Sequence, residues 1–402
     1  MGTEADTWEP LTAGERAVAL EVLTRGPLSR SELARRLDLS AGSLTRLTKP
    51  LIETGLLVEA PEGPARAESR QGRPSRPLDI VAESRAFAGF KITEDTVYGV
   101  VTTLKSDIVA CRDTPLTSRE PGDVVAAIGS VTDAFAAGFP SLCGIGIGLG
   151  GRAQDRAVVD ESAFLGWRDV PLARLVRERT GLPAVVDNDV SALVEAEHWF
   201  GAGRGLDRFA VLTIGAGLGY GLVSGGRRVE TAEDGLGVGR FWIVDPSGPL
   251  SADGRRGSAV SLLTIPSIRS QVRAATGEDA GYEEILARAV EGEPVPARVV
   301  AEAARALGTL VAQIANFAMP QKILLAGEGV GLVDVAAPAI EEAIRANRHP
   351  RADPVNLETK VSDFHDWARG AAVLAIQVLV LGAAEPGPGD VGAAGARVPS
   401  PR

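Results

Sequence analysis

The chain has 402 residues, of which 45% are hydrophobic, so it is too long for one small domain and can bury sizeable cores. Its two cysteines, Cys111 and Cys143, exclude a disulfide framework and favour the cytoplasm, and the acidic start lacks the apolar stretch of a secretory signal. The longest apolar run, residues 209–223, contains four glycines and predicts no membrane span, and the net charge of −10 disfavours non-specific binding of nucleic acid by the whole molecule.

The first predicted unit consists of three short helices. Thr12 and Glu15 form a capping box that opens the first helix, which ends at Gly26. Ser29 and Glu32 form another capping box, so a second helix is expected to begin there. A short turn over residues 38–40 leads to a third helix predicted over residues 41–54. This arrangement is typical of a helix-turn-helix.

The third helix has two contrasting faces. Leucines at positions 44, 47 and 51 share one face at 100° per residue and should pack inward. The residues expected to meet the major groove lie at the helix start and on the opposite face: Ser40, Gly42, Ser43, Arg46 and Lys49. An ordinary helical hairpin with a solvated basic face is the alternative interpretation.

A wing is predicted after this helix. Residues 56–59 can start a strand, and a polar loop rich in glycine and proline follows, with arginines at positions 70, 73 and 76. The tripeptide Gly72-Arg73-Pro74 resembles the core of A·T hooks, in which arginine enters a narrow minor groove. We therefore expect Arg70, Arg73 and Arg76 to contact the DNA backbone or minor groove, with a plain linker as the alternative.

The distribution of charge agrees with a small DNA-binding domain attached to a large acidic domain. Residues 30–78 contain nine Lys/Arg and six Asp/Glu, a balance of +3, so the remainder of the chain carries −13. A basic segment within an acidic protein is typical of a DNA-binding domain attached to a domain with another role.

From about residue 85 the sequence becomes α/β. Three short strands, a helix, a strand and a helix are predicted between residues 85 and 200, and a looser version of the same order follows from residue 208. This duplication predicts two similar lobes with a cleft between them. We expect a DNA-binding domain over residues 1–80, a two-lobed domain over residues 81–383, and a disordered Pro/Gly-rich tail over residues 384–402.

Three segments could line such a cleft. Alternating glycines in TIGAGLGYG, residues 213–221, predict a hairpin whose amides could cradle a phosphate or which packs against a helix. Residues 327–329 could accept an adenosine or simply turn the chain. Asp187-Asn188-Asp189 lies where a strand gives way to a helix, which favours either helix capping or the binding of sugar hydroxyls.

These motifs together resemble the ROK family of bacterial sugar-responsive repressors and sugar kinases. The segments LGWRDVPL, VVDNDVSALVEAE, FGAGRG, LTIGAGLGYGLVSGG and VDPSGP match the family's patterns in order, and the resemblance extends over residues 85–382. It implies an α/β fold with two actin-like (RNase H-like) lobes of the sugar-kinase type and a sugar site between them. Within this family, an N-terminal winged helix-turn-helix marks the regulators.

The resemblance also implies a set of effector-binding residues. Asn188 and Asp189 match the family's sugar-contacting pair, and Asp189 falls on the catalytic base of the kinases. The hairpin matches the second phosphate loop, and residues 327–329 match the adenosine loop. The predicted effector set is Gly151, Asn188, Asp189, Thr213, Gly237 and Arg240.

Several departures from the family pattern argue against catalysis and against zinc. The position of the kinases' Asp-x-Gly-Gly-Thr loop reads Gly-Phe-Lys-Ile-Thr-Glu-Asp over residues 89–95, without the aspartate and paired glycines, so the usual partner of Mg²⁺ and phosphate is missing. Residues 250–258 contain neither Cys nor His, so the zinc loop has no ligands. The Glu-x-Gly-His stretch reads Gly237-Val238-Gly239-Arg240 in an uncertain one-residue register, and Ala163 stands where the family has asparagine. Arg240 would favour an anionic ligand or act as a salt-bridged filler.

The sequence thus predicts a cytoplasmic transcription regulator of the repressor type, without kinase activity, metal or cofactor. Its expected partners are a palindromic double-stranded operator, a sugar or sugar-phosphate effector and further copies of itself, as a dimer or tetramer. The alternatives are a sugar kinase with an accessory DNA-binding domain and a DNA-binding regulator without an effector.

Overall fold

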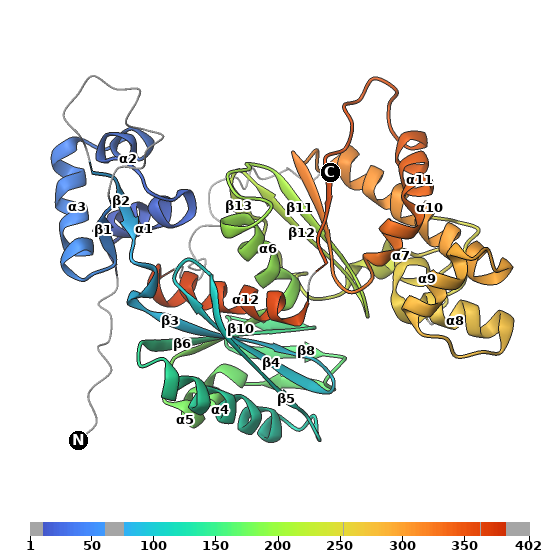
Figure 1. The fold of residues 1–402 in the computed structure, drawn as a ribbon, viewed down its shortest axis with the longest axis horizontal. Helices are drawn as coiled ribbons and strands as arrows, with labels where there is room; N and C mark the ends of the chain where they lie inside the picture. Colours follow the sequence, from blue (N-terminus) through green and yellow to red (C-terminus); the bar gives the residue numbers. More distant parts are fainter. Residues whose placement is uncertain (1–10, 61–75, 252, 362, 383–402) are drawn as a thin grey trace, which may run out of the picture.

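The protein was analysed as a computed structural model that describes residues 11–60, 76–251, 253–361 and 363–382. Three parts follow one another along the chain: a small N-terminal unit, a first lobe and a second lobe (Figure 1). None of the helices within the described ranges combines the length and apolar character needed to cross a membrane.

The N-terminal unit is a winged helix. Its helices are α1 (Ala13–Arg25), α2 (Arg30–Arg36) and α3 (Ala41–Glu53), and its wing strands are β1 (Leu57–Glu59) and β2 (Leu78–Ile80). The strands pair antiparallel. The caps of α1 and α2 lie where the sequence predicted them, because Thr12 and Ser29 each accept a backbone N–H of the helix that follows. Ser40 caps α3 in the same way, which was not predicted.

The first lobe is built on a five-stranded sheet with the order β10-β6-β3-β4-β5. Its strands are β3 (Ala86–Ile92), β4 (Thr96–Thr103), β5 (Ile108–Pro115), β6 (Leu142–Leu149) and β10 (Ala184–Asn188). Strands β3, β6 and β10 are parallel, so their carboxyl ends meet at one edge of the sheet. In α/β sheets ligands bind at such an edge.

Helices cover both faces of this sheet, and a small sheet extends one edge. Helices α4 (Pro121–Gly138) and α5 (Leu172–Thr180) pack together on one face, and α12 (Phe364–Ala375) crosses the other. The small sheet consists of β7 (Arg152–Gln154), β8 (Val158–Ser162) and β9 (Trp167–Val170). Helix α12 approaches β3 and β6 closely because Gly89 and Gly146 have no side chain; a Cβ at either position would collide with an α12 carbonyl.

The second lobe repeats the strand order of the first. Its sheet has the order β13-β12-β11-β14-β15, with β11, β14 and β15 parallel. The strands are β11 (Phe209–Ile214), β12 (Leu218–Ser224), β13 (Arg227–Arg228), β14 (Lys322–Ala326) and β15 (Leu357–Thr359). The predicted duplication of three strands, helix, strand and helix is therefore confirmed.

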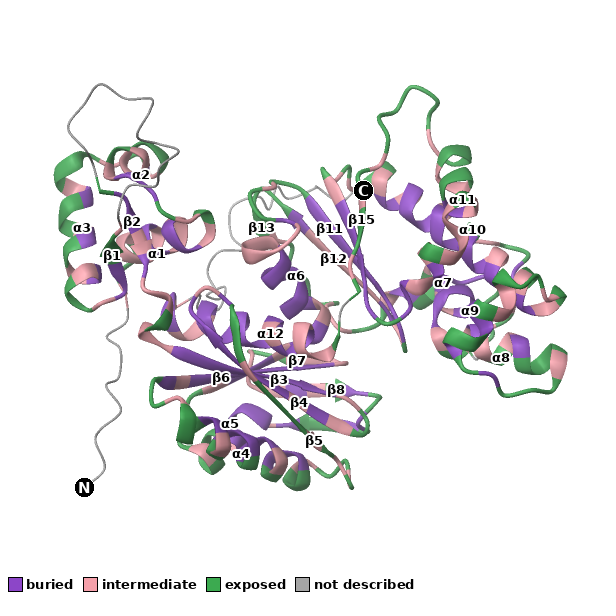
Figure 2. Cartoon of the chain, viewed as in Figure 1, coloured by how far each residue is buried: buried purple, intermediate pink, exposed green. Residues whose placement is uncertain are grey.

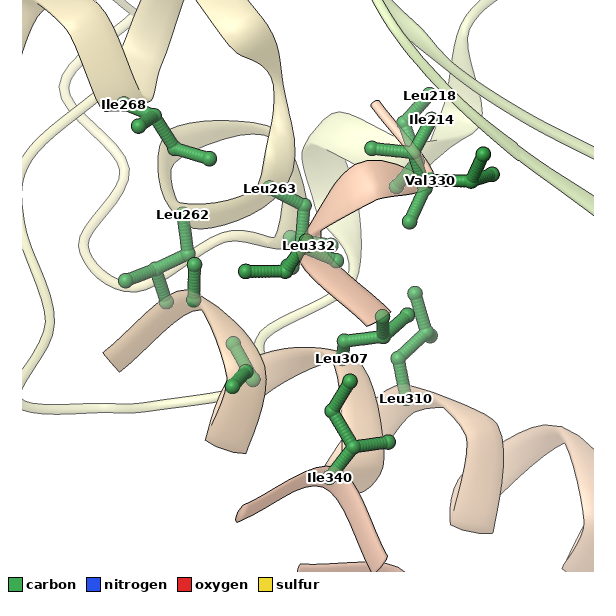
Figure 3. Packing of buried hydrophobic residues seen from close by; sticks show 14 of the residues in the cluster. Ile214, Leu218, Leu262, Leu263, Ile268, Leu307, Leu310, Val330, Leu332 and Ile340 are labelled. Atoms are coloured by element: carbon green, nitrogen blue, oxygen red, sulfur yellow. The ribbon is translucent and has the colours of Figure 1, made fainter. Parts of the chain in front are cut away.

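The second lobe carries the larger helical layer. Its helices are α7 (Ala259–Leu263), α8 (Ile265–Thr276), α9 (Tyr282–Val290), α10 (Pro294–Phe317) and α11 (Gly331–Ala346). Their apolar side chains meet the sheet in one continuous core (Figure 3), in which Leu307, Leu332 and Ile340 are buried. Central strands of both lobes are buried along their length (Figure 2).

Two helices join the lobes to each other and to the winged helix. Helix α6 (Asp189–Phe200) starts at the carboxyl edge of the first sheet, and it packs against α12 and against β12 of the second lobe. The π-helical turn η4 (Ile376–Val380), which continues α12, shares one apolar core with the winged helix. Beyond α6, the guanidinium of Arg204 donates from Nε to the carbonyl of Thr24 in α1 over 2.6 Å. The winged helix is therefore docked on the body.

Candidate functional site

The exposed face of α3 carries the residues predicted to enter a groove. Gly42, Arg46 and Lys49 are exposed, whereas Leu44 and Leu51 are buried against the rest of the winged helix. Lys49 is 3.7 Å from Glu53 in a solvent-exposed ion pair, which contributes little to stability. The predicted contrast between the two faces of this helix is confirmed.

The start of α3 has a local structural role as well. The hydroxyl of Ser40 accepts the backbone N–H of Ser43 over 3.1 Å and lies 3.0 Å from the Ser43 hydroxyl. Ser40 therefore caps the helix and also donates its hydroxyl to that of Ser43, at the end where backbone N–H groups favour an anion. In the wing, Arg76 is exposed just before β2, while Arg70 and Arg73 lie outside the described residues.

The carboxyl edge of the first sheet brings together three predicted effector residues. The side chain of Asn188 donates from Nδ2 to the carbonyl of Gly151 over 2.8 Å. Its Oδ1 accepts the N–H groups of Val190 and Ser191 at the start of α6. The capping interpretation of Asn188 is thus confirmed, and the residue ties the Gly151 loop to the helix.

Asp189 pairs with a residue that the sequence analysis did not assign to the site. Lys91, near the end of β3, donates from Nζ to Oδ2 of Asp189, and both residues are only 7% exposed. Oδ1 of Asp189 accepts the N–H of Val190 over 2.8 Å. The Lys91 ammonium also lies 5.2 Å from the ring centre of Trp367, within range of a cation–π interaction. The sequence showed that residues 89–95, which include Lys91, replace the kinases' first phosphate loop, but not that Lys91 reaches Asp189.

The glycine hairpin of the second lobe serves two purposes. Gly219 and Gly221 pack against Val190 and Val194 of α6, as the helix-packing interpretation predicted. Gly215 instead lies at the turn, where a Cβ would collide with a carboxylate oxygen of Glu328. Thr213, the first residue of the hairpin, is buried and pairs with Gly219. An acidic side chain thus lies against the turn that would approach a phosphate.

Gly237 and Arg240 lie on a separate rim of the second lobe. Gly237 has a positive φ of 64° at the start of the short turn η3 (Val238–Phe241). Arg240 is exposed, and its Nε donates to the carbonyl of Gly237 over 3.3 Å. A hollow of about 400 Å³ beside it is lined by Glu233, Leu236, Val238, Phe241 and Trp242. The structure therefore does not bring Arg240 into contact with Asp189, although Gly235 packs on the Gly151 carbonyl.

An ionic cluster around the Arg228 side chain, which is only 6% exposed, links β13 of the second lobe to α6. Arg228 in β13 lies 3.4 Å from Glu195 of α6, 2.9 Å from Glu230 and 2.5 Å from Asp234. Burial raises the pKa of Glu195 and of Asp187, and the positive charge of Arg228 offsets this only in part. The sequence analysis missed this cluster because its members are separated by up to 47 positions.

A second buried glutamate of α6 has the opposite electrostatics. Glu197, 1% exposed, accepts hydrogen bonds from Lys360 Nζ over 2.8 Å and from Arg369 over 3.0 Å. Burial alone would raise the pKa of this carboxyl, but Lys360, the Ala202 N–H and Arg369 outweigh it and lower the pKa. Helix α6 is therefore tied to β15 and to α12.

The residues that would form the family's zinc loop do not fit a zinc ion. Ser251, Asp253 and Arg255 bond to one another in an exposed turn that has no Cys or His. Across the part of the chain that the structure describes, no three His, Cys, Asp or Glu side chains are grouped to hold a metal.

Comparisons with known proteins agree with this architecture. The sequence profile of the ROK family matches residues 88–378. The DNA-binding transcriptional dual regulator NagC of Escherichia coli K12 is 26% identical over 374 residues, which span 89% of this chain and 90% of NagC. The crystal structure of a ROK family transcriptional regulator, a homolog of the E. coli Mlc protein, superposes with a TM-score of 0.75 at 25% identity and covers 92% of this chain and 98% of its own.

A kinase relative matches a smaller share of the chain. The glucokinase of Halalkalibacterium halodurans is 26% identical over 291 residues, which span 66% of this chain and 87% of the enzyme. The regulators thus match nearly the whole chain, whereas the enzyme matches two thirds of it.

Proposed function

Because this chain belongs to the ROK family, we propose that it is a sugar-responsive transcription regulator of the repressor type, without kinase activity. The observation that carries this proposal is the exposed cationic face of α3, displayed by a winged helix that is docked on a two-lobed body. The regulators it resembles share both parts over about nine tenths of the chain. A role on chromosomal DNA implies a cytoplasmic location.

In this proposal α3 enters the major groove and the wing follows the backbone. Arg46 and Lys49 project from the exposed face, with Gly42 allowing close approach and the capped helix start facing phosphate. Two copies related by a twofold axis would read a palindromic operator. Arg76 is placed to contact the backbone or the minor groove from the wing.

The cleft is proposed to bind a sugar rather than to phosphorylate it. A catalytic base takes a proton from the sugar hydroxyl, whereas the Asp189 carboxylate is already ion-paired with the Lys91 ammonium and accepts the N–H of Val190, which leaves its other lone pairs to accept a hydrogen bond from a sugar hydroxyl. On the opposite wall, Glu328 places negative charge at Gly215, where a nucleotide phosphate would be repelled. Sugar hydroxyls can still bridge such a pair, because they both donate and accept hydrogen bonds.

We further propose that α6 carries the signal from the cleft to the reader. The helix starts at Asp189, and Arg204, just beyond its end, bonds to α1. Trp199 and Phe200 pack into the apolar core of the winged helix. A ligand that shifts the start of α6 would therefore shift the docking of α1 and favour one orientation of the winged helix over another.

The DNA-binding half of the proposal is tested by selecting bound sequences from a random duplex library and titrating the selected duplex. Arg46→Ala should weaken specific binding by about 1–3 kcal/mol without unfolding the protein. The control is Arg351→Ala, an exposed arginine on the second lobe, which should bind as the wild type does. Equal affinity of Arg46→Ala for the selected duplex would refute the assignment of Arg46.

The enzymatic alternative is tested by an ATP-turnover assay over a panel of hexoses. The proposal expects no sugar-dependent turnover, since residues 89–95 lack the aspartate and paired glycines of the kinases' first phosphate loop. Clear turnover with any hexose would establish a kinase with an accessory DNA-binding domain.

A further inference from the structure

Phe164 is an exposed aromatic side chain that lies near glycines of both lobes. It lies in the turn between β8 and β9, and it is 42% exposed, whereas Leu165 and Trp167 beside it are 6% and 4% exposed. The sequence analysis had noted only its neighbour Ala163, which stands in place of the family's asparagine. Ala163 and Gly166 of the same turn are also exposed, so Phe164 is the large apolar side chain of an exposed turn.

The turn that carries Phe164 is held from several sides. The Ser162 hydroxyl donates to the carbonyl of Gly150 over 2.6 Å, and the Arg119 guanidinium donates to the carbonyl of Phe164 over 3.2 Å. The Trp167 indole in turn donates to the carbonyl of Arg119 over 2.6 Å. The backbone beneath the ring is thus fixed while the ring itself is solvated, as in a binding group that is set in place before its ligand arrives.

The ring of Phe164 lies beside Asp189 and faces the other lobe. A methyl group placed on Gly150 would lie 2.9 Å from Cδ2 of Phe164 and 3.8 Å from Oδ2 of Asp189. A methyl group placed on Gly217, in the hairpin turn of the second lobe, would lie 3.9 Å from Cζ of Phe164. The aromatic ring therefore stands between the Lys91–Asp189 pair and the opposite wall, with glycines on both sides.

We propose that Phe164 is the stacking platform of the effector site and selects a pyranose ring; this inference rests on the sugar response proposed above. A pyranose presents hydroxyls around its rim and C–H groups on its face. The rim matches the Lys91–Asp189 pair, which can both donate and accept hydrogen bonds. The C–H face matches the electron-rich face of the phenyl ring, which attracts the positive edges of C–H bonds.

This geometry discriminates cyclic from open-chain ligands. An acyclic polyol of the same carbon number carries the same hydroxyls, but it has no continuous C–H face and loses internal rotations on binding. Phe164 should thus favour a cyclic sugar over its alditol, independently of the hydroxyl pattern that the Lys91–Asp189 pair prefers.

The test measures binding to the full-length protein by calorimetry and thermal shift. The probes are glucose, galactose, xylose and N-acetylglucosamine, each beside its alditol. We expect at least one pyranose to bind more tightly than its alditol. Phe164→Leu should weaken the binding of that pyranose by about 2- to 12-fold and reduce the difference in affinity between pyranose and alditol. Phe164→Trp should keep this difference.

The matched control is Phe241→Leu, which alters another exposed phenylalanine, 54% exposed, on the rim of the second lobe. It should leave pyranose affinity unchanged. Unaltered affinity in Phe164→Leu, or equal binding of pyranose and alditol, would overturn the inference.

The outcome also separates this inference from the proposed function. If no pyranose binds while a selected duplex is still recognised, the stacking platform is refuted and the DNA-binding assignment stands. If a pyranose binds through Phe164 but no duplex is preferred over random competitor, the regulator assignment fails instead.

Discussion

The two lobes have the same strand order, but their equivalent sheet edges carry different chemistry. In the first lobe, the carboxyl ends of β3 and β10 present Lys91, Asn188 and Asp189, all buried and hydrogen-bonded. In the second lobe, the penultimate residue of β11 is Thr213, and β15 ends at the exposed Thr359. A duplicated topology therefore does not duplicate a site, and recognition is concentrated at the edge of the first lobe.

The largest expected effect comes from breaking the buried pair of the first lobe. Asp189→Ala would leave the Lys91 ammonium buried without its carboxylate and should cost about 3–5 kcal/mol of unfolding free energy. Thr359→Ala, at the equivalent edge of the second lobe, should change the unfolding free energy by less than about 0.5 kcal/mol. Urea unfolding followed by circular dichroism measures both.

A companion variant separates the loss of a charge partner from the loss of packing. Lys91→Met combined with Asp189→Asn removes both charges and should be less destabilising than Asp189→Ala alone. Similar costs for Asp189→Ala and Thr359→Ala would mean that the two edges are energetically alike, contrary to the comparison.

Substitution of the two glutamates by which α6 links the lobes should change the unfolding free energy by a smaller amount. The size of this change depends on pH. The lowered pKa of Glu197 means that its stabilisation is fully present above its ordinary value of 4.5 and is lost as the pH falls through the lower folded value. Glu197→Gln should thus cost about 1–3 kcal/mol at pH 7 and progressively less below pH 4.5.

Glu195 should behave in the opposite way. Its folded pKa is raised, so the folded state is favoured below the ordinary value of 4.5 and loses that advantage as the pH rises through the folded value. Relative to the wild type, Glu195→Gln should therefore become more stable as the pH rises from 4 to 7. Parallel pH profiles for the two variants, from thermal unfolding, would contradict the assigned electrostatics.

The smallest effect on stability is expected at the far end of α6. Arg204 is exposed, so Arg204→Ala should change the unfolding free energy by less than about 0.5 kcal/mol. Because it removes the bond to the Thr24 carbonyl, it should nevertheless weaken the response of DNA binding to a ligand in the cleft. Arg208→Ala, an exposed arginine of the same loop, is the control. A full ligand response in Arg204→Ala would remove α6 as the proposed route.

Local signals in the sequence predicted most of the fold. Capping residues at positions 12 and 29 and the glycine at position 26 located the first helices, because these features act within a few residues. The small sheet β7-β8-β9 and the π-helical turn at Ile376–Val380 were not predicted, since short strands and irregular turns depend on tertiary packing.

The candidate site was predicted less completely than the fold. Asn188 and Asp189 were found because they adjoin each other and match a motif. Their neighbours in the site come from other parts of the chain. Lys91 lies 98 positions from Asp189, and Phe164 comes near Asp189 from the turn between β8 and β9. Arg240, which the sequence placed in the same set, is exposed in η3 and bonds to the carbonyl of Gly237 rather than to Asp189.

The central claim is that sugar binding between the lobes changes the affinity of the winged helix for DNA. One titration tests this claim most directly. Fluorescence anisotropy of a selected duplex with the wild-type protein is followed while a pyranose that binds the cleft is added. The account predicts that the sugar raises the Kd for the duplex, because it favours an orientation of the winged helix that binds DNA less tightly. An unchanged Kd at sugar concentrations that saturate the cleft would contradict it.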